Sequence, residues 1–181
     1  MKKTTLFTAL LLTGSLVFAQ KKTTTSATIN FDASTSIDNL PKAENKTAIG
    51  AVDLEKGTIQ FEAAVKNFAF SNPRIQEHFN AAGWLNSEAF PLFSFSGKIT
   101  NLKEVNFKKD GTYAANVEGV LLIKGKEGKV STPATIIVKG ETINATTEFN
   151  IKLSDYGISG VPIDAGKVSK EPRITVLAEL K

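Results

Sequence analysis

Apolar and polar residues alternate along most of the chain from Ala27 onward, so every second side chain falls on one face of an extended strand. The alternation is strictest at 143–153. Gly-containing segments that read as turns separate several of the alternating rows. The pattern therefore predicts seven to eight antiparallel strands. They cover 27–32, 48–54, 59–65, 93–99, 113–123, 130–139, 143–153 and 174–180.

One segment follows a helical period instead. The alternation slips at Asn67, which indicates a bulge or a strand end. Asn72 and Pro73 then form a cap and first-turn signal, and the apolar residues of 74–84 recur at helical spacing. We predict one short helix there, ended by Gly83.

The remaining segments fit around a sheet. Residues 20–26 are polar and predict a frayed arm or a lead-in to the first strand, whereas 157–170 predicts a Gly/Pro-containing loop. Pro133 indicates an edge, a bulge or a strand end within 130–139. The fold class is all-β, and we favour an eight-stranded antiparallel barrel over a sandwich, because several strands are long and one helix is available to plug an opening.

The N-terminus carries an export signal. Two lysines follow Met1, an apolar run extends from Leu6 to Phe18, and Val17-Phe18-Ala19 fits the positions before a cleavage site. We predict a signal peptide at 1–19, cleavage after Ala19 and a mature domain at 20–181. The mature protein would be periplasmic or secreted, an uncleaved anchor being the alternative.

Composition and motifs narrow the chemistry. The sequence has no cysteine and one histidine, which excludes a cysteine nucleophile, thiolate metal sites and multi-histidine metal sites. The formal charge of +4 falls to +2 when Lys2 and Lys3 leave, so neither nucleic acid nor an anionic membrane is an expected partner. No GxSxG, HExxH or P-loop pattern occurs. We expect no enzymatic activity, no cofactor and no metal.

Three stretches resemble the YceI-like family, lipocalin-like bacterial proteins associated with polyisoprenoid binding. The first pairs RIQEHFN at 74–80 with SEAFPLFSF at 87–95, and the second is VEGVLLIKG at 117–125, followed by Pro133. The third is FNIKLSDYGI at 149–158. The resemblance implies an eight-stranded barrel around an elongated apolar pocket, in the periplasm, without cofactor-driven chemistry.

The inward rows themselves mix bulky side chains with very small ones. Small inward residues could leave space for a ligand, or large and small residues could interdigitate in a filled core. Charged residues are absent from the clearest inward rows, so an apolar chain suits the interior best. Burial contributes roughly 3 to 4 kcal/mol per isoprene unit at about 0.8 kcal/mol per CH₂, against an association cost of about 4 to 15 kcal/mol, so several units are needed.

We therefore predict a carrier for an elongated isoprenoid or isoprenoid-quinone ligand, without stable membrane insertion and with a homodimer left open. One rival is an envelope stress or adhesion module with a filled core, and the other is an enzyme that uses His78 with a nearby carboxylate. His78 either contacts a ligand head group or holds a nearby carbonyl or carboxylate within the fold. The predicted ligand-contacting residues are Phe61, Ala63, Phe79, Trp84, Phe93, Phe95, Val117, Gly119, Leu121, Phe149, Ile151 and His78.

Overall fold

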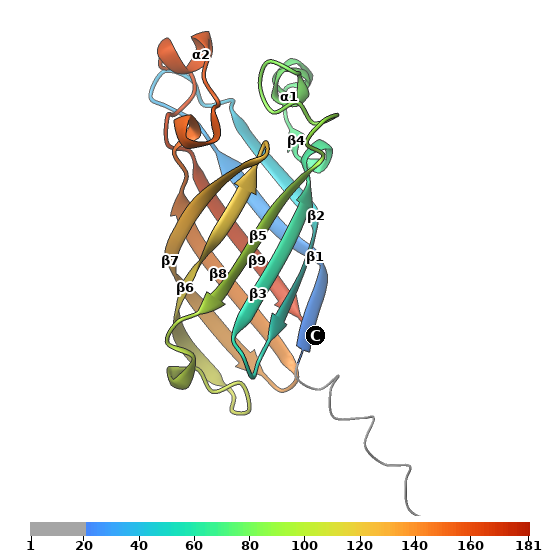
Figure 1. Cartoon of the computed structure of the whole chain (residues 1–181), viewed down its shortest axis with the longest axis vertical. Coiled ribbons are helices and arrows are strands. Elements are labelled where there is room, and N and C mark those ends of the chain that lie inside the picture. The colour runs from blue at the N-terminus through green and yellow to red at the C-terminus, as the bar shows by residue number, and fades with distance from the viewer. Residues whose placement is uncertain (1–20) are drawn as a thin grey trace, which may run out of the picture.

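The computed structural model describes residues 21–181, which form a tilted ring of antiparallel strands (Figure 1). The predicted signal peptide at 1–19 lies outside the described residues. The strands are β1 (Lys21–Asp32), β2 (Lys42–Asp53), β3 (Thr58–Ala64), β4 (Ala69–Phe70), β5 (Leu92–Ile99), β6 (Gly111–Ile123), β7 (Lys126–Lys139), β8 (Thr142–Asn150) and β9 (Arg173–Leu180). The helices are α1 (Pro73–Asn80) and α2 (Val161–Asp164), with short 3₁₀ turns η2 (Val65–Asn67), η3 (Leu102–Glu104) and η4 (Leu153–Tyr156).

The strands close into a barrel. Their order is β1-β9-β8-β7-β6-β5-β3-β2, and β1 also pairs with β2, which completes the ring. The two-residue strand β4 pairs only with β2 and stands outside the eight-stranded ring. Closure gives every strand of the ring a neighbour on each side. The predicted all-β, eight-stranded barrel is confirmed.

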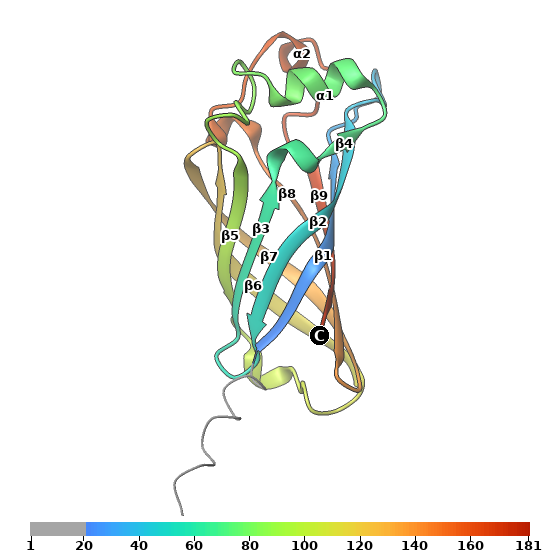
Figure 2. The same cartoon turned by 90° about the vertical axis from the view of Figure 1, so that its right-hand side faces the viewer.

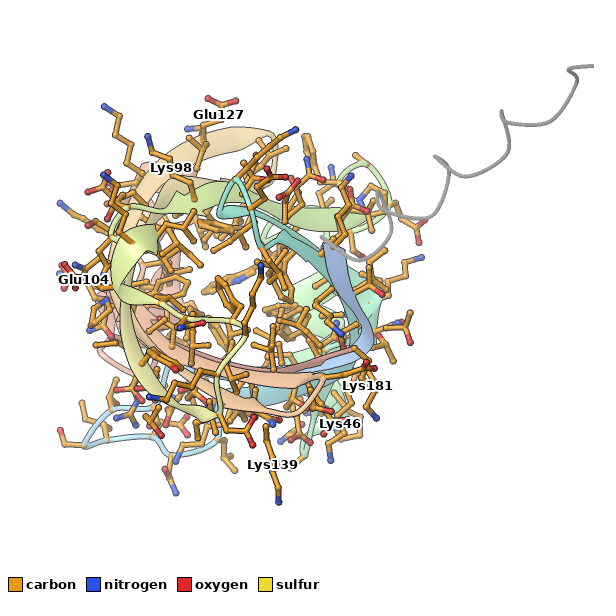
Figure 3. The ribbon with its side chains drawn as sticks, turned by 90° about the horizontal axis from the view of Figure 1, so that it is seen from below. Lys46, Lys98, Glu104, Glu127, Lys139 and Lys181 are labelled. Carbon is orange, nitrogen blue, oxygen red and sulfur yellow. The ribbon has the colours of Figure 1, made fainter. Side chains whose placement is uncertain are left out.

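Alternation along the strands separates the inside of the barrel from the outside. Viewed along the axis, labelled charged side chains such as Lys98, Glu127 and Lys139 point away from the ring (Figure 3). Two apolar clusters lie inside the barrel, one beneath the helices and one at the other end, and Phe61 packs against both. Each strand thus contributes a polar outer face and an apolar inner face.

The two ends of the barrel differ. Helices α1 and α2 lie together at one end, whereas η3 and its loop lie at the other (Figures 1 and 2). The side chain of Asn72 accepts a hydrogen bond from Arg74 N at 2.9 Å, which caps α1 as predicted. No helix of residues 21–181 has the length and apolar character needed to cross a membrane.

Several boundaries differ from the sequence predictions: β2 begins at Lys42 rather than at 48, β7 begins at Lys126 rather than at 130, and β8 ends at Asn150 rather than at 153. Helix α1 ends at Asn80 rather than at Gly83, because Ala81 is already extended (φ −62°, ψ 154°). Residues 21–26 are not a frayed arm but part of β1, which pairs with β2 and is therefore held by ladder hydrogen bonds rather than by apolar burial. The predicted loop at 157–170 contains the short helix α2.

Other local predictions hold. The 3₁₀ turn η2 interrupts the strand pattern where the alternation slips at Asn67. Gly57 in the predicted hairpin turn has φ +68°, and Asp53 Oδ1 accepts the backbone N–H groups of Glu55 and Lys56. Such a conformation suits glycine because it has no Cβ.

Candidate functional site

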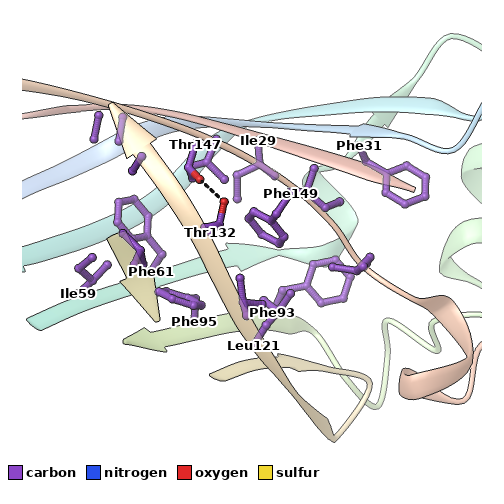
Figure 4. Close-up of a pocket in the computed structure, with 18 of the residues that line it drawn as sticks. Ile29, Phe31, Ile59, Phe61, Phe93, Phe95, Leu121, Thr132, Thr147 and Phe149 are labelled. Carbon is purple, nitrogen blue, oxygen red and sulfur yellow. Dashed lines mark hydrogen bonds between the residues drawn. The ribbon is translucent and has the colours of Figure 1, made fainter. Parts of the chain in front are cut away.

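The barrel interior contains a cavity of about 180 Å³. All eight strands of the ring contribute to its lining, as do Phe79, Trp84 and Leu85 in and after α1. Figure 4 shows labelled side chains from several of the strands gathered in the barrel interior. Phe61, Phe93 and Phe149 point inward yet are only half-buried, so they border space rather than a filled core. The interior is thus partly hollow.

The lining is almost entirely apolar. It contains no charged side chain, and threonines are its only polar residues. The Thr132 hydroxyl donates to the Glu148 carbonyl at 3.0 Å, and the Thr147 hydroxyl donates to the Pro133 carbonyl at 2.8 Å. Because these hydroxyl protons are already engaged, the interior offers a ligand little polar contact and much apolar contact.

Aromatic rings gather at the helix end of the cavity. The ring of Phe79 on α1 lies 4.8 Å from that of Phe70, 5.8 Å from Phe31 and 5.9 Å from Phe68, between centroids. Phe68 in turn contacts Phe93 at 5.7 Å. Tilted and edge-on pairs of this kind stabilise aromatic clusters. The cluster fixes α1 across this end of the barrel.

Most of the predicted contact residues border this cavity. The nine that do are Phe61, Phe79, Trp84, Phe93, Phe95, Val117, Leu121, Phe149 and Ile151. Their contact with a ligand remains a prediction.

Three predicted residues lie elsewhere. Ala63 is buried in the apolar cluster beneath the helices, and His78 is exposed on α1, outside the cavity lining. Gly119 creates no space, because the Phe95 ring covers it: a Cβ at Gly119 would lie 2.5 Å from Phe95 Cζ. Gly97 is covered by the same ring. At these two positions, large and small residues interdigitate.

The sequence reasoning missed other lining residues. The inward residues of β1 and β9, such as Ile29, Phe31 and Ile174, complete the wall. The alternation of apolar residues in these two strands could have identified them as inward-facing. Assigning them to the cavity also required the register of the first strand against its neighbours. Phe68 and Leu85 lie between regular elements, where no period indicates which way a side chain points.

The structure also bears on other chemistries. Within residues 21–181, no three His, Cys, Asp or Glu side chains come together as a metal site would require. The pKa of Asp32 is lowered: burial opposes the shift, but hydrogen bonds from Ser34, the positive charge of Lys42 and a hydrogen bond from Arg173 outweigh it. This carboxylate joins β1 to its neighbours through ion pairs and does not border the cavity.

The model of the YceI-like domain matches residues 7–180 of the chain. The protein belongs to the YceI-like family. This confirms the resemblance carried by the motifs at 74–95, 117–133 and 149–158. No curated protein matches the sequence.

Solved structures of similar fold come from several bacteria. BcnA of Burkholderia cenocepacia superposes with a TM-score of 0.69 at 20% identity, covering 86% of this chain and 96% of that one. A polyisoprenoid binding domain from Saccharophagus degradans, implicated in plant cell wall breakdown, gives a TM-score of 0.75 at 10% identity, covering 90% and 98%. The YceI protein of Campylobacter jejuni gives 0.53 at 17% identity, covering 100% and 99%. At these identities the likeness shows the fold.

Proposed function

We propose that this YceI-like protein is an exported carrier that holds an elongated apolar ligand of the isoprenoid or isoprenoid-quinone type inside its barrel. The observation that carries the proposal is the cavity lining, which runs through the interior without a charged side chain. A charged or sugar-like ligand would lose its water there without gaining partners. An apolar chain has no hydrogen bonds to water to give up, and its burial in the cavity removes apolar surface from water, which is favourable.

The size of the cavity sets the scale of the ligand. A water-sized sphere needs roughly 10–15 Å³ of cavity volume, so about 180 Å³ accommodates on the order of a dozen groups of methyl size. That corresponds to roughly two to three isoprene units at five carbons each, and their burial contributes about 6 to 12 kcal/mol at about 0.8 kcal/mol per CH₂. This is comparable to the association cost of about 4 to 15 kcal/mol, so a longer chain would bind more tightly if the barrel widens.

Two further observations support the proposal. The Saccharophagus degradans domain of the same fold is described as polyisoprenoid-binding. The N-terminal sequence carries an export signal, and a holder for a water-insoluble molecule is useful between membranes. The exposed position of His78 outside the cavity gives no support to a His78-dependent enzyme.

Organic extraction of the gently purified protein, followed by mass spectrometry, tests the proposal. We expect a co-purified apolar chain. Ala145→Phe, which fills the cavity from β8, should abolish its recovery. The matched control is Thr135→Phe, on the exposed outer face of the neighbouring strand β7, which should retain the ligand.

A direct binding measurement complements extraction. Trp84 is the only tryptophan and lines the cavity, so its fluorescence should change when farnesol is added. A protein that is empty when purified and shows no fluorescence response to farnesol would refute the carrier function and favour an interaction module.

A further inference from the structure

The wall of the barrel is split between β7 and β8. Their ladder runs from Lys139 and Thr142 to Ala134 and Thr147 and ends there. Both strands nevertheless continue toward the helix end, β7 to Lys126 and β8 to Asn150, while each stays paired with its other neighbour. The two strands therefore separate in one half of the barrel.

Pro133 explains where the split begins. In the extended register Pro133 would face Glu148, but proline has no N–H to donate to the Glu148 carbonyl. The Thr132 hydroxyl donates to the Glu148 carbonyl instead, at 3.0 Å. The same hydroxyl lies 3.1 Å from the Thr147 hydroxyl (Figure 4). Along an antiparallel ladder, the backbone N–H and C=O groups of every second residue face the same partner strand. Ser131 is two residues from Pro133 and Asn150 is two residues from Glu148, so the backbone groups of Ser131 and Asn150 face the split.

A polar pocket of about 290 Å³ occupies the split. Exposed residues of both strands and of the segment after β8 line it, among them Lys129, Lys152, Asp155 and Glu171. Their charges balance, two positive against two negative. An ionised ligand group would therefore meet as much repulsion as attraction, whereas an uncharged polar group would meet donors and acceptors.

Tyr156 forms one side of this pocket. Its ring is buried, with the hydroxyl in contact with Gly128 of β7, where a Cβ would collide with it. The Tyr156 hydroxyl makes no hydrogen bond within residues 21–181. Among these residues, the only fully buried side-chain oxygen or nitrogen without a hydrogen-bond partner is Asn80 Oδ1, so the Tyr156 hydroxyl is not fully buried. The hydroxyl is thus accessible from the pocket. Burial, and then the negative charge of Asp155, raises the pKa of Tyr156, which keeps this group protonated as a donor.

The polar pocket adjoins the apolar cavity. Val130, Phe149 and Ile151 line both spaces, so these residues form a shared boundary between them. A chain lying in the barrel could extend its end between them. We propose that the split between β7 and β8 binds the uncharged polar head group, such as a hydroxyl or carbonyl, of the ligand whose chain fills the barrel. This inference rests on the proposed carrier function.

Paired probes and paired tyrosine variants test the inference. Farnesol and farnesene share an isoprenoid chain, but only farnesol has a hydroxyl, and the binding of both can be followed through Trp84 fluorescence. The protein has two tyrosines, so Tyr113→Phe is a matched control for Tyr156→Phe. The Tyr113 hydroxyl donates to the Lys109 carbonyl at 2.8 Å, away from the split. Tyr156→Phe should weaken farnesol about two- to tenfold, the worth of one hydrogen bond, and leave farnesene unchanged. Tyr113→Phe should change neither.

A disulfide provides an independent test in this cysteine-free chain. Ser131 and Asn150 face each other in the extended register, so Ser131→Cys with Asn150→Cys should tie the split shut when oxidised. We expect the oxidised form to bind farnesol no more tightly than farnesene. Reduction with dithiothreitol should restore the tighter binding of farnesol. Ile137→Cys with Asn144→Cys, a pair already joined in the ladder and outside both pocket linings, should bind like the original protein in both redox states.

The failures are distinguishable. If neither probe binds the original protein, the carrier function falls and this inference falls with it. If farnesene and farnesol bind but Tyr156→Phe and the oxidised Ser131–Asn150 pair leave farnesol affinity unchanged, the head-group site alone is wrong.

Discussion

Gly119→Ala should destabilise the barrel although it adds a single methyl group. A Cβ there would lie 2.5 Å from Phe95 Cζ, 2.5 Å from the Ser96 carbonyl oxygen and 2.7 Å from Gly97 Cα. The phenyl ring can turn aside, but the two backbone atoms belong to β5, which pairs directly with β6 at this point. Relief therefore requires the two strands to move apart.

The expected loss follows from two opposing effects. Overpacking costs about 1–3 kcal/mol, whereas replacing a strand glycine by alanine returns about 0.5–1 kcal/mol of backbone entropy. Because backbone rather than a flexible side chain obstructs the methyl group, we expect the larger overpacking cost and a net loss of about 2 kcal/mol. At about 2–4 °C per kcal/mol for a domain of this size, Tm should fall by roughly 4–8 °C.

Urea unfolding followed by circular dichroism and Trp84 fluorescence measures this loss. Gly83→Ala is the control, because nothing lies within 4 Å of a Cβ at that position, and its stability should change by less than about 0.5 kcal/mol. If Gly119→Ala proves as stable as Gly83→Ala, the close covering of the glycine by β5 is wrong. A displaced Phe95 ring would also enter the cavity, so the variant should bind farnesol more weakly.

Two other perturbations have definite expected outcomes. Asn45 is fully buried, and its side chain donates a hydrogen bond to the Ala64 carbonyl at 3.0 Å. Asn45→Ala should therefore lower the free energy of unfolding, measured by urea titration, by about 1–3 kcal/mol. A loss under about 0.5 kcal/mol would contradict this role. Because the pKa of Tyr156 is raised above 10.0, the folded protein keeps a proton that the unfolded chain releases, so stability should fall as pH rises through and above about 10. Tyr156→Phe should show a smaller fall over the same pH range, and an identical fall would refute the assignment.

The strand pattern was predictable where apolar burial alone determines it. Strict alternation at 143–153 gave the inward face of β8, including Phe149. It left Lys21–Ser26 open between a frayed arm and a lead-in to the first strand, because those residues become a strand through hydrogen bonds to β2, and a polar sequence does not reveal a distant backbone partner. It also failed for α2, a helix too short for a period to register.

The site was predictable in character but not in detail. The absence of charge from inward rows indicated an apolar interior. Gly119, however, was predicted to contact the ligand, and only the orientation of the Phe95 ring reveals that this glycine is covered. Pro133 indicated an edge, a bulge or a strand end, and the strand end is wrong, because β7 continues through it from Lys126 to Lys139. Beside Pro133 only the ladder to β8 stops, and that depends on how β8 lies beyond Thr147, which the sequence does not specify.

The position of β9 has a consequence for how the protein is made. This C-terminal strand lies between β1 and β8, and Thr23 and Lys181 exchange two backbone hydrogen bonds of 3.0 Å. During synthesis, β1 and β8 therefore gain their second neighbouring strand only after β9 has been made. Pairings between residues this far apart in sequence form slowly, and a chain without them remains an open sheet. If the protein is exported as proposed, late closure would help to keep the chain unfolded until it has crossed the membrane.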